Sequence, residues 1–570
     1  MSVRGDAALL DTLRGIVGRR HVLTDEKRTR RFRKGQRFGE GPVLAVVQPG
    51  TLVEQWRVLQ AAVAADVIVI LQAANTGLTG GSTPDGDDYE RPVLLLSTLR
   101  LTGVQLINDG TQAVCLPGAT LDALERALAP LGREPHSVIG SSCFGASVVG
   151  GVCNNSGGSL VQRGPAYTQL SLYGQIGADG ALRLVNHLGV ALGDDPEEML
   201  RRLESGDFRP DDVDAAADRW AHDCGYAGHV RDIDSATPAR FNADSRCLYE
   251  AAGSAGKIIV FAVRLDSFVK EEGATTFYIG TNDPAQLTAI RRTILGEFSL
   301  LPVAGEYMHR DAFDIADGYG KDMFIAIERL GTDRLPRLFA LKSRVDALPL
   351  VGAGFSDRIM QRIGRMLPDH LPPEMRAWRN RFEHHLLLKM PLAAVADTRA
   401  LLTDLFAAGE GGYFECSPAL AAKAFLHRFV AAGAAVRYRA VHAREVEDIV
   451  PLDVALPRNI PEWQEKLPPD LAAQSIHSLY YGHFMCHVFH QDYIVRKGVD
   501  LLAFEHRIWA LLDERGAEYP AEHNVGHLYK AKPDLADFYR QIDPRNQCNP
   551  GIGQTVRARH WGEQQKEVPS

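Results

Sequence analysis

The sequence predicts an α+β protein built from two or three domains. A chain of 570 residues is too long to fold around one hydrophobic core. Short β-branched runs that read as buried strands alternate with amphipathic stretches that read as helices. Two segments rich in Gly, Ser and Asn, at 72–82 and 137–164, interrupt this pattern. We expect the first domain to be organised around these two segments.

Composition excludes several classes of protein. The apolar share of 45% and charged share of 24% are typical of a folded soluble chain. The net charge of -8 argues against general nucleic-acid binding, which requires a basic face. No uninterrupted apolar run reaches the ~18 residues of a membrane-spanning helix, and we expect no signal peptide. Eight scattered Cys residues without a C-x-x-C pair favour a reducing compartment.

The first elements lead into a Gly-rich loop. Thr51 to Glu54 matches a capping box, which predicts a helix running to about Ala65. Val67 to Leu71 reads as a buried strand, and it continues directly into Q-A-A-N-T-G-L-T-G-G-S at 72–82. A second strand is expected at 93–97. Leu side chains along one face then predict a helix over 120–131 that stops at Gly132.

The second Gly-rich segment, 137–164, contains S-V-I-G-S-S-C-F-G-A-S-V-V-G-G-V-C-N-N-S-G-G. Glycine lets the backbone turn tightly and approach a bound ligand closely. A stretch with few bulky side chains and many main-chain N–H groups suits a phosphate-bearing ligand that is wrapped by backbone. A set of tight turns explains one such stretch equally well, but the pair favours a ligand.

Two common nucleotide-binding motifs are absent. No G-x-G-x-x-G occurs, so a Rossmann dinucleotide site loses its main support. The run Gly253 to Lys257 suggests a P-loop, but Ile258 stands where a Ser or Thr must hold the metal.

The two Gly-rich segments together resemble the FAD-binding domain of the vanillyl-alcohol-oxidase class of flavoproteins, which is also called PCMH-type. Within that class the chain is similar, nearly end to end, to the respiratory quinone-dependent D-lactate dehydrogenases of bacteria. The further segments that carry this resemblance are R-F-N-A-D (240–244), G-S-A-G-K-I-I-V-F-A-V-R-L-D (253–266), V-A-G-E-Y-M-H-R-D (303–311), F-L-H-R-F (425–429), Y-P-A-E-H-N-V-G-H-L-Y-K (519–530) and N-P-G-I-G (549–553).

The resemblance implies a two-lobed FAD-binding domain and an α+β cap domain. It implies a FAD-binding domain over 1–268, closed by the C-terminal segment 517–570. The cap or substrate domain then covers 269–516, with 311–387 as the candidate membrane-associating part.

The resemblance also implies which residues contact FAD. Most are small, so recognition by main chain is expected. Neither Gly-rich segment carries a His at its tip, so we expect the FAD to be held non-covalently. The implied residues are Ala73, Ala74, Asn75, Thr76, Gly77, Gly81 and Ser82 around the pyrophosphate, Gly140, Ser147 and Gly157 along the flavin and ribityl chain, and Val260 through its backbone.

Two basic stretches are candidates for an anionic partner. In 329–365 eight Arg and Lys side chains lie among Leu, Ile and Phe, and the resemblance implies contact with a membrane there. Basic residues near an anionic lipid surface contribute roughly 1 kcal/mol each. A solvated amphipathic helix is the alternative. Residues 28–37 are also basic, and they read as a solvated loop, with a phosphate or an acidic surface as the alternative. With no spanning helix, attachment is expected to be peripheral and reversible.

Histidines concentrate late in the chain. In related FAD-linked 2-hydroxy-acid dehydrogenases, G-H-x-x-D-G-N-x-H and a later Glu bind a divalent metal, and His483, His490 and Glu522 fall on those positions. Here Cys486-His487-Val488 replaces Asp-Gly-Asn. Residues seven apart lie on opposite faces of a straight strand, so whether the two His meet depends on a bend. A metal site and a polar pocket lining both stay open.

His523 is the leading candidate for the catalytic base, because oxidation of a hydroxy acid requires a group that takes the hydroxyl proton and His has an unperturbed pKa of ~6.5. His490 and Arg310 are the further catalytic candidates. The substrate carboxylate requires a cation, preferably Arg. Besides Arg310, the residues Lys389, Arg428 and Arg458 are candidates, and the sequence does not rank them. Glu383, His384 and His385 either face the site or belong to the core.

The resemblance implies FAD-dependent oxidation of D-lactate to pyruvate, with electrons passed to a membrane quinone at the cytoplasmic face of the bacterial inner membrane. The nearest alternative is another D-2-hydroxy acid, such as 2-hydroxyglutarate or glycolate. An oxidase that reduces oxygen is a further alternative. A non-enzymatic flavin sensor or membrane-binding protein is the rival from another class, and the late His and Glu cluster argues against it.

Overall fold

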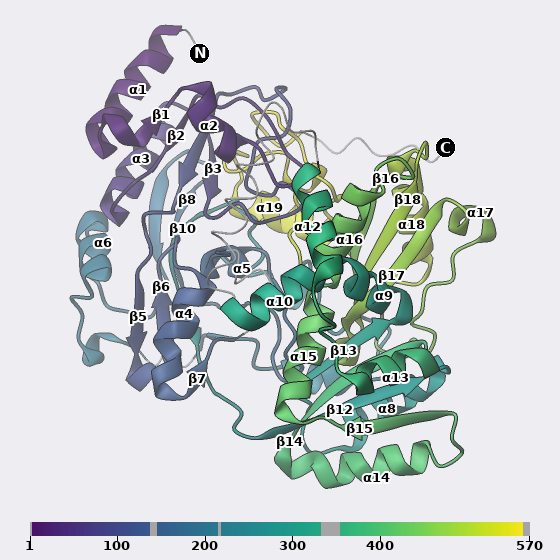
Figure 1. Ribbon diagram of the computed structural model, residues 1–570. Coiled ribbons are helices and arrows are strands. Elements are labelled where there is room, and N and C mark those ends of the chain that lie inside the picture. Colours follow the sequence, from purple (N-terminus) through teal and green to yellow (C-terminus); the bar gives the residue numbers. More distant parts are fainter. Residues whose placement is uncertain (1–2, 137–144, 215–217, 332–353, 563–570) are drawn as a thin grey trace.

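The chain folds into two α+β halves, seen in the computed structural model of Figure 1. The structure describes residues 3–136, 145–214, 218–331 and 354–562. The N-terminal half contains sheets of four and five strands and a small two-stranded sheet, and the second half contains one sheet of seven strands. The predicted α+β class is confirmed. In Figure 1 the yellow C-terminal segment returns to the N-terminal half.

The four-stranded sheet delivers the first Gly-rich segment. Thr51 caps helix α3 (Leu52–Ala64), its hydroxyl accepting the Glu54 N–H at 3.1 Å, as the capping box predicts. The helix crosses to β3 (Ile68–Gln72), which pairs in parallel with β4 (Val93–Ser97). Buried apolar side chains fill these strands because helices cover the sheet. The other elements here are α1 (Val3–Val17), β1 (Val22–Leu23), α2 (Glu26–Arg33) and β2 (Ala45–Val47).

The five-stranded sheet is antiparallel and packs beside the first one. The predicted helix over 120–131 forms as α4 (Leu121–Leu128) followed by one 3₁₀ turn. Gly132 ends it in the left-handed conformation, with φ of 64°. The elements here are β5 (Val104–Ile107), β6 (Gln112–Cys115), β7 (Arg133–Glu134), α5 (Val148–Cys153), β8 (Ser171–Ile176), β9 (Leu182–Asn186), α6 (Pro196–Ser205), α7 (Tyr226–Arg231), β10 (Ile259–Asp266) and β11 (Phe268–Val269).

The second half is built on a seven-stranded antiparallel sheet in the order β15-β12-β14-β13-β17-β18-β16. Both of its faces are buried: Leu386 and Leu388 of β14 pack into one apolar cluster, and Leu387 between them packs into another. The strands are β12 (Ala274–Thr281), β13 (Ala304–His309), β14 (His384–Pro391), β15 (Gly411–Glu415), β16 (Val446–Ala455), β17 (Ser475–His483) and β18 (Val488–Arg496).

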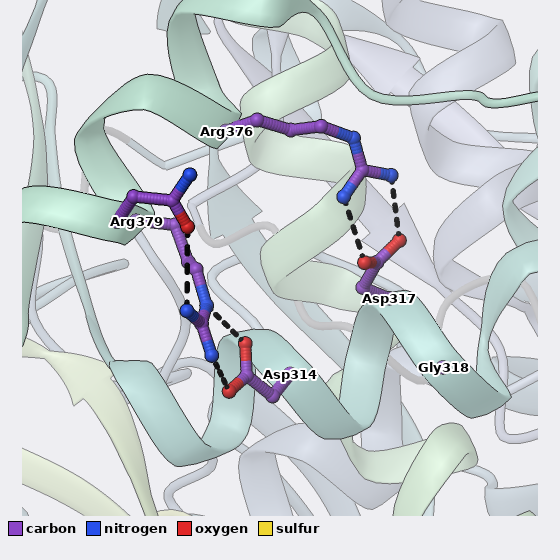
Figure 2. A pocket seen from close by; sticks show the side chains of 6 residues that line it. Asp314, Asp317, Gly318, Arg376 and Arg379 are labelled. Carbon is purple, nitrogen blue, oxygen red and sulfur yellow. Dashed lines mark hydrogen bonds and ion pairs between the residues drawn. The ribbon is translucent and has the colours of Figure 1, made fainter.

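Helices cover both faces of this sheet (Figure 1). Helix α9 is tied to α13 by two ion pairs, Arg376 to Asp317 at 2.9 Å and Arg379 to Asp314, which line a polar pocket (Figure 2). The helices of this half are α8 (Pro284–Glu297), α9 (Arg310–Tyr319), α10 (Lys321–Leu330), α12 (Phe355–Met366), α13 (Pro373–Arg381), α14 (Val395–Leu405), α15 (Pro418–Phe429), α16 (Ala431–Val441), α17 (Pro469–Ala472) and α18 (Leu501–Glu514).

The C-terminal segment packs against the N-terminal half. The main chain of Asn549 donates to the Val69 carbonyl at 3.0 Å, and the N–H of Val69 donates to Gln547 at 3.1 Å, so the segment lies alongside β3. Helix α19 (Pro533–Ile542) precedes this contact. Residues far apart in sequence are thereby brought next to the Gly-rich loop that follows β3.

Among the described residues, no single helix has the length and apolar composition to cross a membrane. One bent pair, α15 and α16, passes that test only when taken together, with an angle of 46° between the helices. All seven described cysteines are free thiols.

Candidate active site

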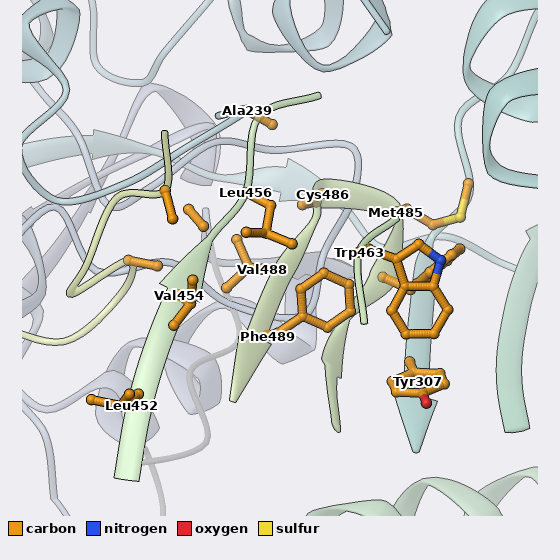
Figure 3. Close-up of a cluster of buried hydrophobic side chains, with 14 of the residues drawn as sticks. Ala239, Tyr307, Leu452, Val454, Leu456, Trp463, Met485, Cys486, Val488 and Phe489 are labelled. Atoms are coloured by element: carbon orange, nitrogen blue, oxygen red, sulfur yellow. The ribbon is translucent and has the colours of Figure 1, made fainter. Parts of the chain in front are cut away.

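His483 and His490 meet across a hairpin. His483 ends β17 and His490 lies on β18, and their rings are 5.5 Å apart. The turn is one 3₁₀ turn followed by His487, which takes the left-handed conformation with φ of 54°. The bend therefore forms without the Asp-Gly-Asn of the related enzymes. Figure 3 shows the apolar cluster that anchors it, with Cys486 and Phe489 packed near Trp463.

A network of buried charges surrounds His483. Its Nδ1 lies 2.6 Å from Glu306 and its Nε2 lies 3.1 Å from Glu522. Arg428 pairs with Glu306 at 3.1 Å, and Arg240 pairs with Glu522 at 2.6 Å. Two carboxylates thus hold one imidazole between two guanidinium groups, all of them at least four-fifths buried.

Electrostatics sets different protonation states in this cluster. Burial alone would lower the pKa of His483, but Glu306 and Glu522 outweigh it and raise that pKa to about 10. His483 is therefore an imidazolium at neutral pH. Burial, together with the charges of Arg428 and His483, holds the pKa of His490 well below its usual value, so His490 is neutral. Two histidines side by side thus have different chemical roles available to them.

Asp453 organises the C-terminal segment. Its Oδ2 accepts the main-chain N–H of Glu522 at 2.6 Å and of His523 at 3.0 Å. The same oxygen lies 3.3 Å from Nδ1 of His523, and Oδ1 lies 3.4 Å from Nδ1 of His490. Burial raises the pKa of Asp453, and the nearby His523 opposes that rise. One buried carboxylate therefore positions both candidate histidines.

His523 lies at the junction of three segments. The residue before it, Glu522, occupies the space that a Cβ on Gly157 would need. The residue after it, Asn524, accepts a hydrogen bond from the Thr79 hydroxyl through its main-chain carbonyl at 2.8 Å. The side chain of His523 is 46% exposed, whereas those of His483 and His490 are largely buried. Of the three histidines, His523 is the one open to a small molecule.

The first Gly-rich segment forms a loop that is pinned at both ends. The Gln72 amide donates to the carbonyl of Ser82 at 2.6 Å and to that of Phe32 at 2.8 Å. The Ser82 hydroxyl donates to Oδ1 of Asn75 at 3.3 Å. Most main-chain N–H groups from Ala73 to Ser82 find no acceptor among the described residues. A half-buried loop with free N–H groups fits the pyrophosphate of FAD.

The C-terminal segment closes over this loop. A Cβ on Gly77 or on Gly81 would collide with the side-chain amide of Asn524. Glycine at both positions therefore leaves room for the close approach of Asn524. The packing of Asn524 on this loop brings the predicted FAD residues within 73–82 and the predicted base His523 into one region. The sequence alone could not establish that these two segments meet.

Two further residues predicted to contact FAD, Ser147 and Val260, already make hydrogen bonds within the protein. Ser147 caps α5 by accepting the Gly150 N–H at 3.0 Å, so its hydroxyl already has a partner. Val260 is fully buried in β10, and its carbonyl accepts from the Gln55 amide at 3.1 Å. Gly140 lies outside the described residues.

The structure distinguishes the four cations that the sequence left unranked. Arg428 joins the cluster, lies 4.5 Å from the Tyr481 ring centroid, and has a buried Nε without a hydrogen-bond partner among the described residues. Arg310 instead donates to the Phe382 carbonyl at 3.1 Å and lies 3.9 Å from Glu383. Arg458 is buried against the Thr237 carbonyl, and Lys389 lies in the middle of the cap sheet.

His384 and His385 belong to the core of the cap. His384 lies 2.8 Å from the Tyr307 hydroxyl, and His385 packs edge-on to Tyr278. Both nitrogens of His385 are buried without a hydrogen-bond partner among the described residues. Burial first, and then the charges of His384 and Arg310, lower the pKa of His385 to about 3.

We expect His385 to make the protein sensitive to acid. Because the folded pKa of about 3 lies below the unfolded value of ~6.5, the unfolded chain binds the proton first. The free energy of unfolding therefore falls by ~1.4 kcal/mol per pH unit as pH drops below ~6.5. In His385→Leu, the melting temperature should fall less between neutral pH and about pH 5 than in the wild type. The exposed His506→Leu should behave like the wild type, and an unchanged pH dependence in His385→Leu would refute this origin.

Donor atoms of His483, His490 and Glu522 lie within 4.8 Å of one another. Imidazole and carboxylate are ligands that zinc accepts, and a carboxylate behind a ligating His, as Glu306 lies behind His483, is common at such sites. The residue types therefore fit a divalent metal, which would take the place of the proton that His483 carries. The same atoms also form ion pairs with Arg240 and Glu306, and the roles assigned below rest on those pairs.

Three residues of the cluster had no predicted role. Glu306 stands in V-A-G-E-Y-M-H-R-D and Arg240 in R-F-N-A-D, two segments that carry the resemblance, whereas Asp453 stands outside those segments, in L-D-V-A-L-P (452–457). A buried charged residue within an apolar strand, such as Asp453 in β16, was the available signal. Its partners could not be identified, because they lie on other segments of the chain.

Two family models and several known proteins are similar to this chain. The model of the family described as "D-lactate dehydrogenase, membrane binding" matches residues 276–561, and that of a FAD binding domain matches 43–183. The quinone-dependent D-lactate dehydrogenase of Escherichia coli (strain K12) is 57% identical over 567 residues, covering 99% of both chains. Enzymes with the same name from Haemophilus influenzae and Corynebacterium glutamicum are 54% and 47% identical, over 97% of this chain and 99% and 97% of theirs.

Solved structures share the fold at much lower identity. A substrate-bound p-cresol methylhydroxylase aligns with a TM-score of 0.56 at 11% identity, covering 97% of each chain. An alkyldihydroxyacetonephosphate synthase aligns with a TM-score of 0.56 at 10% identity, over 95% of this chain and 84% of that one. The PCMH-type fold expected from the sequence is thereby confirmed.

Proposed function

The chain belongs to the quinone-dependent D-lactate dehydrogenase family, and from that premise we propose which of its residues carry the reaction. The enzyme oxidises D-lactate to pyruvate with FAD as cofactor, and the electrons pass to a quinone. When bound, FAD accepts a hydride from the substrate α-carbon. The protein must therefore hold the hydroxy acid, take its hydroxyl proton and keep the cofactor in place.

His523 is the base that takes the hydroxyl proton. The single observation that carries this assignment is its place between Glu522, which packs on Gly157, and Asn524, which packs on the loop at Gly77. Asp453 lies 3.3 Å from Nδ1 and so favours a proton on that nitrogen, which leaves Nε2 to accept another. His483 is unsuited to this role because its raised pKa keeps it protonated.

His490 and Asp453 support the base. His490 is neutral and buried, with its ring 6.0 Å from that of His523, and it shares Asp453 with it. An imidazole in this place can hydrogen-bond to the substrate oxygen without adding charge. The buried Asp453 then stabilises the imidazolium that forms on His523 as the proton arrives.

Arg428 binds the substrate carboxylate. Its Nη2 is held by Glu306, and Glu306 is held in turn by the imidazolium of His483. The buried Nε has no hydrogen-bond partner among the described residues, which leaves a donor for an anionic ligand. Arg310, the earlier candidate, contacts Phe382 and Glu383 instead.

FAD is held by main chain along the first Gly-rich loop. We assign the pyrophosphate to the N–H groups of Ala73, Ala74, Asn75, Thr76, Gly77, Gly81 and Ser82, with Gly157 and the backbone of Val260 along the rest of the cofactor. Binding is non-covalent.

A panel of hydroxy acids tests the substrate assignment. In a dye-reduction assay, D-lactate should be oxidised with a higher kcat/KM than glycolate or D-2-hydroxyglutarate. Among the described residues of this cluster, Arg428 and Arg240 each have a guanidinium nitrogen without a hydrogen-bond partner, and Arg240 is fully buried. Only Arg428 is therefore available to a carboxylate, and a second substrate carboxylate would lack a cation. Preferential oxidation of 2-hydroxyglutarate would contradict the assignment.

Helix α12 is the part of the cap that we assign to the membrane. Five of the sixteen large hydrophobic side chains that are exposed among the described residues lie on this one helix, and Met366 is 85% exposed. Basic side chains at Arg358, Arg362 and Arg365 accompany them. An outward-facing mixture of apolar and basic residues is typical of a helix that lies in the surface of an anionic bilayer. The five are Phe355, Ile359, Met360, Ile363 and Met366.

We propose peripheral attachment through α12, at the cytoplasmic face of the inner membrane. The predicted membrane segment also included Arg334, Arg337, Lys342 and Arg344, which lie outside the described residues. We therefore base the lipid contact on α12 alone.

Removing apolar side chains from α12 should release the enzyme from lipid. In Ile359→Ser/Ile363→Ser/Met366→Ser, we expect at least about tenfold weaker binding to phosphatidylglycerol vesicles in co-sedimentation, because buried apolar area drives insertion. Dye reduction by the soluble enzyme should be unchanged. The control Val269→Ser/Leu392→Ser/Leu502→Ser removes equally exposed side chains elsewhere and should bind normally. Full vesicle binding by the α12 variant would refute the assignment.

A further inference from the structure

We propose that a basic surface formed by helix α2 and the four residues that follow it, in the N-terminal half, binds the same anionic lipid surface as α12. The α2 basic surface consists of Lys27, Arg28, Arg30, Arg31, Lys34 and Arg37. The inference rests on the proposed role of α12 and extends the membrane contact from the cap to the half that carries the FAD loop.

The segment from Asp25 to Glu40 is basic, although the protein as a whole is acidic. Between Asp25 and Glu40 the chain has seven basic and three acidic side chains, in a protein with a net charge of -8. Helix α2 is anchored from below by the buried Thr29 and Phe32, so its basic side chains point outward. All six members of the α2 basic surface are exposed.

The acidic side chains of this segment already have local partners. Asp25 caps α2 by accepting the Arg28 N–H at 3.0 Å. Glu26 pairs with Arg33 at 2.8 Å, and Glu40 pairs with Lys34 at 2.9 Å. Lys27, Arg30 and Arg31 form no ion pair with any acidic side chain among the described residues. These three charges are available to an external anion.

Contacts connect the α2 basic surface to α12. The Arg37 guanidinium donates to the Ile449 carbonyl of β16 at 2.9 Å, which ties this segment to the cap. Strand β16 packs against α16, and Ala440 near the end of α16 packs against Gly354 at the start of α12. The two basic elements are thus connected through strand β16 and helix α16, both of which Figure 1 labels.

The two elements offer different contacts to a bilayer. None of the exposed large hydrophobic side chains of the described residues lies between Asp25 and Glu40, whereas five lie on α12. The α2 basic surface is therefore suited to lipid headgroups and α12 to insertion. Attraction to headgroups is screened by salt, with a Debye length of ≈ 10 Å at 0.1 M, but insertion is much less sensitive. Contact through both elements places the half that carries the FAD loop next to the lipid in which a quinone dissolves.

Vesicle binding by a charge-removal variant tests the proposal. Lys27→Gln/Arg30→Gln/Arg31→Gln should bind phosphatidylglycerol-containing vesicles at least about tenfold more weakly at low salt, since each charge near an anionic surface contributes roughly fivefold. Its remaining binding should depend less on salt. The control Arg126→Gln/Arg183→Gln/Arg201→Gln removes the same charge from other exposed sites of the same half and should bind like the wild type. Dye reduction should be unchanged in both.

The outcomes separate this proposal from the one for α12. If the α2 variant binds with wild-type affinity and salt dependence while the α12 variant is released, the α2 proposal is wrong and that for α12 stands. If the wild type does not bind the anionic vesicles at all, both are wrong. Hydrogen exchange of the wild type gives an independent result: amides of α2 should exchange more slowly on vesicles, and unchanged exchange there would overturn the proposal.

Discussion

Replacing His523 with Gln should lower kcat for D-lactate by about 10²- to 10⁴-fold, the usual contribution of a positioned general base. Gln keeps the size and polarity of the side chain but cannot take up a proton. Because we assign FAD to the loop at 73–82 and not to His523, the purified variant should keep its flavin absorbance. Stopped-flow reduction of the bound flavin, rather than steady-state turnover alone, measures this step directly.

The control for this variant is His506→Gln, an exposed His on α18 that has no contact with the cluster. It should retain wild-type kinetics. Retention of full activity by His523→Gln would remove His523 from the mechanism and favour its neighbour His490 as the base.

Replacing Arg428 with Met should raise KM for D-lactate by about 30-fold or more, equivalent to ~2 kcal/mol of lost carboxylate contact. Met preserves an apolar stem against the Tyr481 ring but provides no donor. Glu306 keeps its partner His483, so the cluster should remain folded and the flavin bound. Steady-state kinetics over a range of D-lactate concentrations measures the change.

Arg310→Met provides the matched comparison, because both arginines were candidates for the same role. Arg310 contacts the Phe382 carbonyl, outside the cluster, so its replacement should leave KM within about twofold of the wild type. Arg428→Lys should recover part of the affinity through its remaining charge. An unchanged KM in Arg428→Met, together with an increase in Arg310→Met, would reverse the assignment.

Local elements of the N-terminal half could be predicted because their signals are local. The hydroxyl of Thr51 caps α3 as its spacing to Glu54 indicates, and the apolar run at 67–71 forms β3 within one residue. The cap sheet could not be predicted in the same way. Strand β14 is buried on both faces and shows no alternation of apolar and polar residues, and its neighbours β12 and β13 pair with it from distant parts of the sequence.

The candidate site was predictable in its residue types but not in its assembly. The order His483, His490, Glu522 and His523 was visible in the sequence, but the hairpin that joins the first two depends on a left-handed His487. Glu306 lies 177 residues before His483, and no local pattern connects them. The separation of Arg428 from Arg310 likewise depends on tertiary contacts, because Arg428 of α15 reaches Glu306 whereas Arg310 of α9 reaches the Phe382 carbonyl.

The most direct test of the central claim is anaerobic mixing of the purified enzyme with each enantiomer of lactate while the flavin spectrum is recorded. The account predicts a yellow protein whose flavin absorbance bleaches with D-lactate and persists with L-lactate. Bleaching by L-lactate alone, or a folded protein that binds no flavin, would contradict it.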